Sequence, residues 1–274
     1  MNWRSVRAIA LKDLKEVRQN KAAWIPAVVV PMMFAVAMPL LFILLPQFIP
    51  VNDMEKELGD MQELIVKMPA AMQVIFAGRS LEQGFVIYMT AFMLAPMFLI
   101  MPLMFSTIVG SDSFVGERER KTMEALLYTP ASDGTLFMGK IVASVIPAIL
   151  ISWLTYALYI VVVNAASWPL FGRIWFPLAS WWPLMFWLTP AISLLGMSAT
   201  VLLSSRAKTF MEAYQLSGSL VVLVLVLVVG QISGVLFLGV WTTMAIGLLV
   251  WVVDAVLIYI GVGTFNRSSL IAKL

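Results

Sequence analysis

GSDSFVGERERKTMEALLYTPASDGTLFMG, residues 110–139, is the longest polar stretch with a helical pattern in a chain that is 61% hydrophobic. Long apolar runs flank it on both sides. Charged side chains are costly inside a bilayer, so this segment is expected to lie in water at a membrane surface. Its charged residues are Asp112, Glu117, Arg118, Glu119, Arg120, Lys121, Glu124 and Asp133. The pattern predicts a charged helix held between two membrane spans.

The composition of the whole chain supports this interpretation. Only 12% of the 274 residues are charged, whereas a soluble domain is about 25% charged and about 45–50% apolar. We therefore predict one all-α transmembrane domain over residues 1–274. The chain contains neither Cys nor His, and so lacks thiolate nucleophiles and the commonest general base and metal ligand. We expect it not to be an enzyme and to hold no cofactor or metal.

Six apolar runs are long enough to cross a membrane, which takes about 20 residues in a helix. The almost uncharged stretch 213–263 is too long for one crossing, and it is divided into two spans by a tight turn between Gly230 and Gly239. The predicted spans are Ile25–Leu45, Phe85–Ile108, Lys140–Asn164, Trp181–Leu203, Ala213–Gly230 and Val240–Gly261. The domain is therefore divided into an N-terminal helix (1–24), spans 1–2 (25–109), a charged segment (110–139), spans 3–6 (140–263) and a tail (264–274).

The distribution of basic residues predicts the orientation of the spans. Fourteen of the 18 Lys and Arg residues fall in segments 1–24, 109–140, 204–212 and 264–274. The other four, Lys56, Lys67, Arg79 and Arg173, lie in the proposed outer segments. Because cytoplasmic loops are enriched in Lys and Arg, both termini and the charged segment are expected to face the cytoplasm. The expected location is the inner or plasma membrane.

Two further segments are expected at the membrane surfaces. Residues 2–21 are amphipathic, either as a basic flank that fixes orientation or as a helix lying in the inner interface, and the two interpretations are compatible. Its apolar side carries Trp3, Val6, Ala10, Leu14 and Val17. The outer segment 47–84 is expected to hold a short amphipathic helix with Met54, Leu58, Met61 and Ile65 on one face.

Aromatic residues between spans 3 and 4 are expected in the outer headgroup layer. They include Trp168, Trp175, Trp181 and Trp182. Simple interfacial anchoring is the preferred interpretation, with an aromatic substrate cage as the less favoured one.

Within the charged segment, residues 114–128 are predicted to form a helix. Glu117 precedes Lys121 by four residues and Arg120 precedes Glu124 by four, a spacing that allows ion pairs worth a few tenths of a kcal/mol. Phe114, Val115, Ala125 and Leu126 share an arc that could be buried. Pro130, Asp133 and Gly134 are typical of a turn that ends the helix. The alternative is a solvated hairpin between spans.

The run Gly116-Glu-Arg-Glu-Arg-Lys-Thr-Met-Glu-Ala-Leu-Leu-Tyr-Thr-Pro-Ala-Ser132, followed by Gly139-Lys140, resembles the segment after the second span of ABC-2-type transporter permeases. It is most similar to the sodium-exporter-like branch, in which a GE(K/R)ER-T-E-LL-TP pattern is usual. The motif covers about 25 residues, while the resemblance in six-span layout covers nearly the whole chain.

The resemblance implies a six-span subunit that pairs with a second permease copy and docks on cytoplasmic ABC ATPases, which bind ATP and Mg²⁺. The helix after span 2 would transmit the movement of the ATPases to the spans, as a coupling helix, and the substrate path would lie between spans 2 and 5 of both copies. Carried onto this sequence, the ATPase-coupling candidates are Glu117, Arg118, Glu119, Thr122, Glu124 and Leu127.

Two other features offer competing functions. Gly134 to Lys140 fits the start of a phosphate-binding loop, but Ile141 stands where Ser or Thr should hold Mg²⁺, and no strand precedes it. Asp254 is the one acid deep inside a predicted span, where it is either a structural acid bonded to Ser, Thr or Asn or a polar contact for a cation or substrate. The leading hypothesis is therefore an ATP-driven exporter subunit. The alternative is an ion-coupled carrier that uses Asp254, and the substrate stays open.

Overall fold

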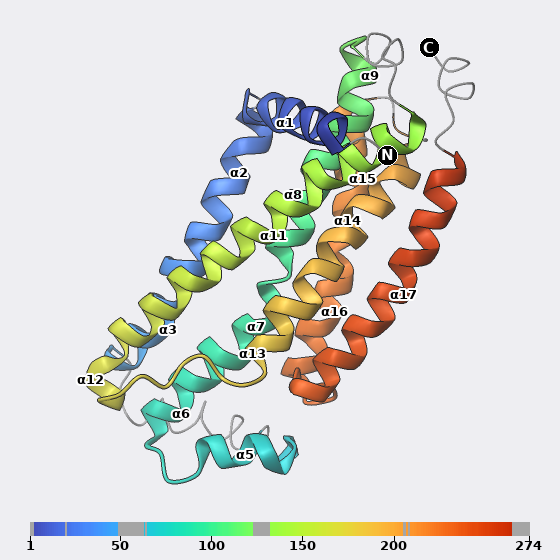
Figure 1. The fold of residues 1–274 in the computed structure, drawn as a ribbon. Helices are drawn as coiled ribbons and strands as arrows, with labels where there is room; N and C mark the ends of the chain where they lie inside the picture. Colours follow the sequence, from blue (N-terminus) through green and yellow to red (C-terminus); the bar gives the residue numbers. More distant parts are fainter. Residues whose placement is uncertain are drawn as a thin grey trace.

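In the computed structural model the chain forms a bundle of long helices (Figure 1). The structure describes residues 3–19, 21–48, 63, 65–122, 132–204, 207 and 209–264. All regular structure in these ranges is helical. This confirms the all-α prediction for the part of the chain described.

Five helices are long and apolar enough to cross a membrane: Leu81–Glu119, Gly134–Ala166, Trp181–Ser204, Phe210–Ile232 and Val240–Gly261. They match predicted spans 2 to 6, with ends that differ by up to eleven residues. The first predicted span follows α2 (Lys21–Met32), the π-helical turn η1 (Met33–Ala37) and α3 (Met38–Leu44). Its apolar part, Val28–Leu44, is shorter than the other five. Six full-length spans therefore stay a prediction.

The second span is one helical path that runs straight into the charged segment. It comprises α6 (Leu81–Ile87), η3 (Tyr88–Met93), α7 (Leu94–Met97), α8 (Ile100–Ser111), η4 (Asp112–Gly116) and α9 (Glu117–Glu119). Lys121 adopts a left-handed conformation with φ 58°. Its N–H bonds the carbonyl of Arg118 at 3.1 Å, and the Thr122 N–H bonds that of Glu117 at 2.9 Å. This pair of bonds is a Schellman motif, which ends a helix.

The predicted helix over residues 114–128 is therefore wrong in its extent. Its first six residues are the last turns of the span-2 helix, and the helix stops at Glu119. Residues 123–131 lie outside the described part of the chain. Gly110 to Glu117 are buried, so this half of the segment packs inside the protein rather than facing water.

The third span also begins earlier than predicted. Ser132 caps α11 (Asp133–Ala166) by accepting a hydrogen bond from the Thr135 N–H at 3.3 Å. Gly134 to Lys140 are thus helical and do not form a phosphate-binding loop. With 34 residues α11 is about 51 Å long, well beyond a hydrocarbon core of about 30 Å.

Near the C-terminal end of α11 the core is aromatic and centres on Trp181. Its indole is fully buried against Phe98, Tyr159 and Phe176, with ring centroids 4.9 to 5.3 Å away. Its Nε1 donates to the Ala91 carbonyl at 2.9 Å. The prediction that Trp181 lies at the headgroups is wrong for this reason. Trp168 and Trp182 are 53% and 51% exposed, and Trp175 is half-buried, so these three keep access to the surface.

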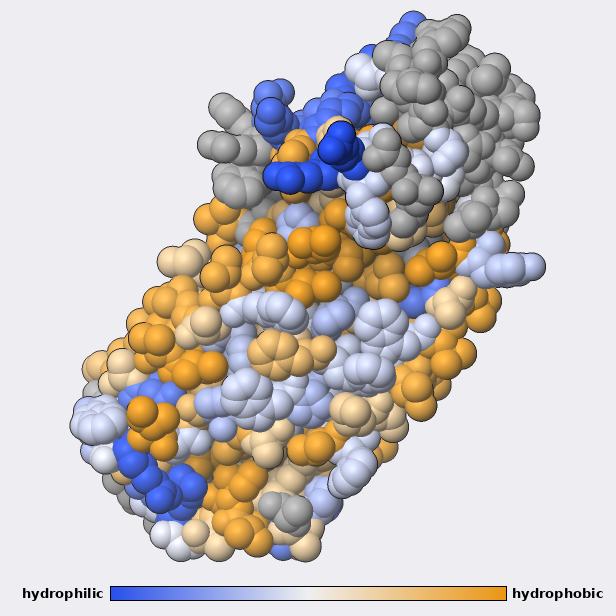
Figure 2. All heavy atoms as spheres, in the orientation of Figure 1, coloured by the Kyte–Doolittle hydropathy of each residue, from blue (hydrophilic) through white to orange (hydrophobic). Residues whose placement is uncertain are grey.

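Strongly apolar side chains are widespread on the face between the two ends of the molecule, around a central area of weakly hydrophilic residues (Figure 2). On α11 the exposed ones recur every three or four residues: Ile146, Leu150, Leu154, Leu158 and Val161. Similar rows lie on α16 (Val221–Ile232) and α17 (Val240–Thr264). Large exposed apolar faces mark interaction with a membrane or another protein.

The two ends of the bundle carry different elements (Figure 1). One end holds α1 (Trp3–Gln19), α9, the start of α11, the turn between α14 (Thr189–Ser204) and α15 (Phe210–Gly218), and the end of α17. The opposite end holds α5 (Ala70–Phe76), α12 (Trp168–Phe171) and the connection from α16 to α17, where Gly234 has φ 74°. That connection lies where a tight turn was predicted. The predicted outer helix around residues 54–65 falls mostly outside the described residues.

Candidate functional site

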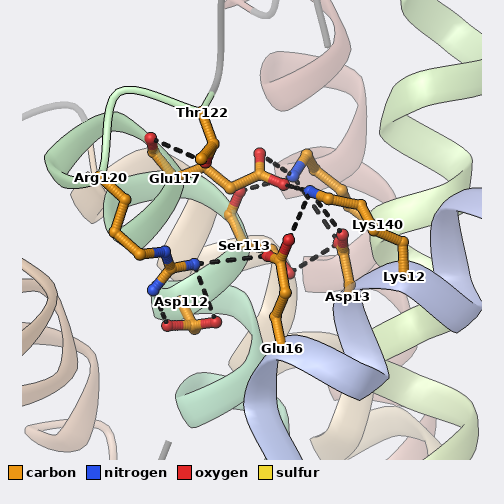
Figure 3. Close-up of polar contacts among 9 residues, drawn as sticks. All are labelled: Lys12, Asp13, Glu16, Asp112, Ser113, Glu117, Arg120, Thr122 and Lys140. Carbon is orange, nitrogen blue, oxygen red and sulfur yellow. Dashed lines mark hydrogen bonds and ion pairs between the residues drawn. The ribbon is translucent and has the colours of Figure 1, made fainter. Parts of the chain in front are cut away.

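A network of buried and partly exposed charges joins α1 to the end of the second span and the start of the third (Figure 3). The helix α1 lies across the end of the bundle and packs against α11, α2 and α8. We call this network the ionic junction. Its members are Lys12, Asp13, Glu16, Asp112, Ser113, Glu117, Arg120 and Lys140.

Lys140 of α11 is the buried cation of the ionic junction. Its side chain is 0% exposed, and its Nζ lies 2.6 Å from Glu117 Oε2 and 3.7 Å from Asp13 Oδ2. It also donates to the Ser113 carbonyl at 2.5 Å, while the Ser113 hydroxyl donates to Asp13 Oδ2 at 2.8 Å. Four elements, α1, η4, α9 and α11, thus share one set of charge-assisted hydrogen bonds.

A second layer of ion pairs covers this centre on the solvent side. Lys12 contacts Glu117 directly and lies 3.3 Å from Glu16. Arg120 forms a bidentate ion pair with Asp112, at 2.9 and 3.3 Å, and a further ion pair with Glu16 at 3.4 Å. Four carboxylates therefore face three cations, and two of the cations, Lys12 and Lys140, each contact one oxygen of the same Glu117.

The charges of the junction shift the pKa values of its outer cations. Burial alone would lower the pKa of Lys12. The hydrogen bond to Glu117 and the charges of Glu117, Asp13 and Glu16 outweigh burial, and they raise that pKa above its ordinary value of 10.5. The hydrogen bond to Asp112 likewise raises the pKa of Arg120. Both side chains are therefore charged at neutral pH.

Two glycines make room for the ionic junction. A Cβ on Gly116 would lie 2.8 Å from Asp112 Oδ1 and 3.1 Å from Arg120 Nη1, so a side chain there would obstruct this pair. A Cβ on Gly139 would lie 2.8 Å from Ile9 Cγ2, because α1 crosses α11 closely at that point. The Gly-Glu and Gly-Lys dipeptides of the sequence motif thus each place a small residue beside a buried charge.

Arg118 and Glu119, which follow Glu117 in the chain, bond the turn between α14 and α15. Arg118 donates to the carbonyls of Ala207 and Ser204, just beyond and at the end of α14. The Glu119 carboxylate accepts the Phe210 N–H at 2.8 Å, at the start of α15. A cation at a helix C-terminus and an anion at an N-terminus both suit the helix dipole. These contacts tie the charged end of the second span to spans 4 and 5, and Lys140 ties it to span 3.

The predicted coupling residues therefore have different environments. Glu117 is 0% exposed and presents no surface to a partner in this structure. Arg118 is half-buried, whereas Glu119 and Thr122 are exposed. Glu124 and Leu127 lie outside the described residues. The predicted local pair of Glu117 with Lys121 is replaced by the pairs with Lys12 and Lys140. The predicted pair of Arg120 with Glu124 lies outside the described residues.

Sequence reasoning did not assign Asp13, Asp112 or Lys140 to the site. One signal was available, because Asp13 follows Val6, Ile9 and Ala10 on the buried face of α1. An acid on the apolar stripe of an amphipathic helix indicates a buried partner. Lys140, at the boundary of an apolar run, carries the same indication.

Three acids of the junction could in principle bind a cation. Carboxylate oxygens of Asp13, Glu16 and Glu117 lie within 4.8 Å of one another. The Lys12 ammonium, however, contacts all three. A lysine of the chain thus supplies the positive charge that a metal would bring.

Asp254 lies apart from the ionic junction, on α17 against α14. It is 0% exposed, and its Oδ1 lies 3.5 Å from the Ser198 hydroxyl. That hydroxyl also bonds the Leu194 carbonyl at 2.8 Å, so its single proton is shared. The second carboxyl oxygen has no hydrogen-bond partner among the described residues.

The apolar helices and the closed ionic junction at one end define a multi-pass helical membrane protein. The sequence matches the family model described as ABC-2 family transporter protein over residues 7–246. The chain therefore belongs to this family of membrane permease subunits of ABC transporters, which normally work with a cytoplasmic ATPase. No curated protein and no solved structure matches the chain. Assignment to the sodium-exporter-like branch stays a prediction.

Proposed function

We propose that this chain is the permease subunit of an ATP-driven exporter, moved by a separate ATPase that docks at the end carrying the ionic junction. The membership in the ABC-2 family carries this proposal. ATP and Mg²⁺ would be bound by the ATPase, and a second permease copy would complete the transporter. The excess of Lys and Arg at this end supports a cytoplasmic orientation.

The contacts of the ionic junction support a role in transmitting force. Lys140 and Glu117 join the third span to the second, and Asp13 joins α1 to both. Arg118 and Glu119 extend the connection to the turn between α14 and α15. Force that the ATPase applies at this end would then act on several spans at once, which favours rigid-body rocking over the bending of one helix.

This arrangement divides the coupling residues by role. Glu119 and Thr122 are exposed and are the described candidates for contact with the ATPase, together with the half-buried Arg118. Glu117 would act from inside, by positioning the helix end that carries them. In the proposal Glu124 and Leu127 keep their predicted contact role.

Co-purification with an ABC ATPase encoded beside the gene tests the proposal. The double variant Glu119→Arg/Thr122→Arg should lose the ATPase, because two exposed contact positions gain positive charge and bulk. Lys67→Glu, exposed at the opposite end of the bundle, is the matched control and should retain it. The melting temperature of each permease variant shows whether the fold survives. Retention of the ATPase by a folded double variant would contradict the proposed docking site.

A second candidate function rests on Asp254. A buried carboxyl oxygen without a described partner could bind a coupling ion, as in a carrier that works alone. Asp254→Asn should then abolish transport by the permease reconstituted without any ATPase. If the wild-type chain alone moves nothing and transport appears only with ATPase and ATP, this alternative fails.

A further inference from the structure

The end of the bundle opposite the ionic junction brings two arginines together. Arg79 lies in the turn between α5 and α6, and Arg173 follows α12. Both line one pocket of about 520 Å³, together with Gln83 and Phe171. Figure 2 shows a small hydrophilic patch at the lower left of this end, within apolar surface.

The backbone holds both arginines in place. Each follows directly on a glycine in the left-handed region, Gly78 with φ 70° and Gly172 with φ 60°. Gln83 completes a capping box with Ser80 and donates to the Leu170 carbonyl at 2.7 Å, which ties the start of α6 to α12. The Arg79 guanidinium lies 5.6 Å from the centroid of the Phe171 ring, which itself stacks on Trp175.

The two positive charges are not neutralised within the described chain. None of the ion pairs among the described residues involves Arg79 or Arg173. Burial, followed by the nearby charge of Arg173, lowers the pKa of Arg79. An arginine side chain nevertheless carries a positive charge at neutral pH. Like charges that face one pocket favour an anion between them.

A second, mainly apolar pocket of about 610 Å³ adjoins the first. The two pockets share Val74, Ala77 and Arg79, and the second continues along Ile65, Phe76 and Leu81. A polar pocket joined to an apolar one matches a molecule with an anionic head and a hydrocarbon tail. Exposed Trp168 on α12 is also typical of the headgroup level of a bilayer.

We propose that Arg79 and Arg173 form a binding site for the phosphate group of an amphiphile, whose chain lies in the adjoining apolar pocket. Arginine suits this ligand because its planar guanidinium group donates bidentate hydrogen bonds to phosphate oxygens. The phosphate can belong to a lipid headgroup of the surrounding leaflet or to a soluble phosphate compound with an apolar part. The site is independent of the ATPase-docking end and of the proposed coupling.

Binding of phosphatidylglycerol to the purified full chain in neutral detergent tests this site, with native mass spectrometry to count bound lipid. Diacylglycerol, which has the same chains without phosphate, is the reference ligand. Arg79→Gln and Arg173→Gln should each weaken phosphatidylglycerol binding about tenfold, the loss of one charge-assisted contact. The double variant should bind the two lipids equally. Lys67→Gln, which removes a positive charge at the same end outside both pockets, should behave as the wild type.

Inorganic phosphate, against chloride at matched ionic strength, identifies the source of the ligand. Phosphate that binds the lipid-free wild type but not the double variant supports a soluble phosphate compound. Phosphatidylglycerol binding that phosphate fails to displace supports a lipid. The proposal is overturned if the folded wild type binds neither probe through the arginines. It is also overturned if binding appears only after Asp53, Glu55, Glu57 and Asp60 are neutralised, because the chain's own acids would then fill the site.

Discussion

Replacing Lys140 by Met removes the buried cation of the ionic junction while keeping a side chain of similar length. Glu117 loses a partner 2.6 Å away and Asp13 loses one 3.7 Å away, and both carboxylates are almost fully buried. Breaking a buried ion pair on one side costs about 3–5 kcal/mol. Glu117 keeps its contact with Lys12, so we expect the lower end, about 3 kcal/mol of unfolding free energy.

A double-mutant cycle separates the ion pair from simple loss of packing. Glu117→Gln alone should cost a similar amount, because it leaves buried Lys140 with Asp13 as its one remaining carboxylate, beside the Ser113 carbonyl. The double variant Lys140→Met/Glu117→Gln should cost at least about 1.5 kcal/mol less than the sum of the two single changes, since the groups are in direct contact. Lys67→Met is the exposed control and should stay within about 0.5 kcal/mol of the wild type.

The assay is equilibrium unfolding in detergent micelles, followed by intrinsic tryptophan fluorescence, which the ten Trp residues make possible. A Lys140→Met protein as stable as the Lys67→Met control would refute the reasoning. So would strict additivity in the cycle, because it would mean that the two groups do not interact.

Three further predictions follow from individual contacts. Gly139→Val should displace α1 because its Cβ would meet Ile9 at 2.8 Å. Because the chain has no Cys, a Val6→Cys variant can report the displacement. Its cysteine should react faster with maleimide in the Gly139→Val background than with the native Gly139, and equal rates would contradict the close crossing. The pKa of Lys12 is raised on folding, so its stabilising effect is complete below pH 10.5 and declines above it. The difference in unfolding free energy between the wild type and Lys12→Gln should therefore decrease as the pH rises above 10.5. An increase would contradict the prediction. Trp181→Ala should cost about 3–5 kcal/mol in unfolding free energy, whereas its half-exposed neighbour Trp182→Ala should cost clearly less; similar losses would contradict the assignment of Trp181 to the core.

The sequence was sufficient to predict the membrane class and the approximate course of five long spans, because both depend on the length and polarity of local segments. It was not sufficient to predict where the charged helix ends. Left-handed C-terminal caps usually carry Gly or Asn, and here Lys121 takes that conformation. Composition therefore gave no stop signal at Glu119.

The partners of the charged residues were also beyond local reasoning. Glu117 was expected to pair with Lys121 one helical turn away, yet it pairs with Lys12 and Lys140, which come from other elements. Spacing rules describe neighbours on one helix, and they do not describe a helix end that is buried between two others. The same limitation applies to Trp181 and Trp182, which are adjacent in sequence and point to opposite environments.

Cross-linking of the ATPase to single cysteines tests the central claim most directly, because the chain has no native Cys. Thr122→Cys places the reporter beside the ionic junction, and Lys67→Cys places one at the opposite end of the bundle. We predict that a thiol-reactive cross-linker joins the co-expressed ATPase to the Cys at position 122 and not to the Cys at position 67. Cross-linking at position 67 alone, or at neither position in an intact transporter complex, would contradict docking at the ionic junction.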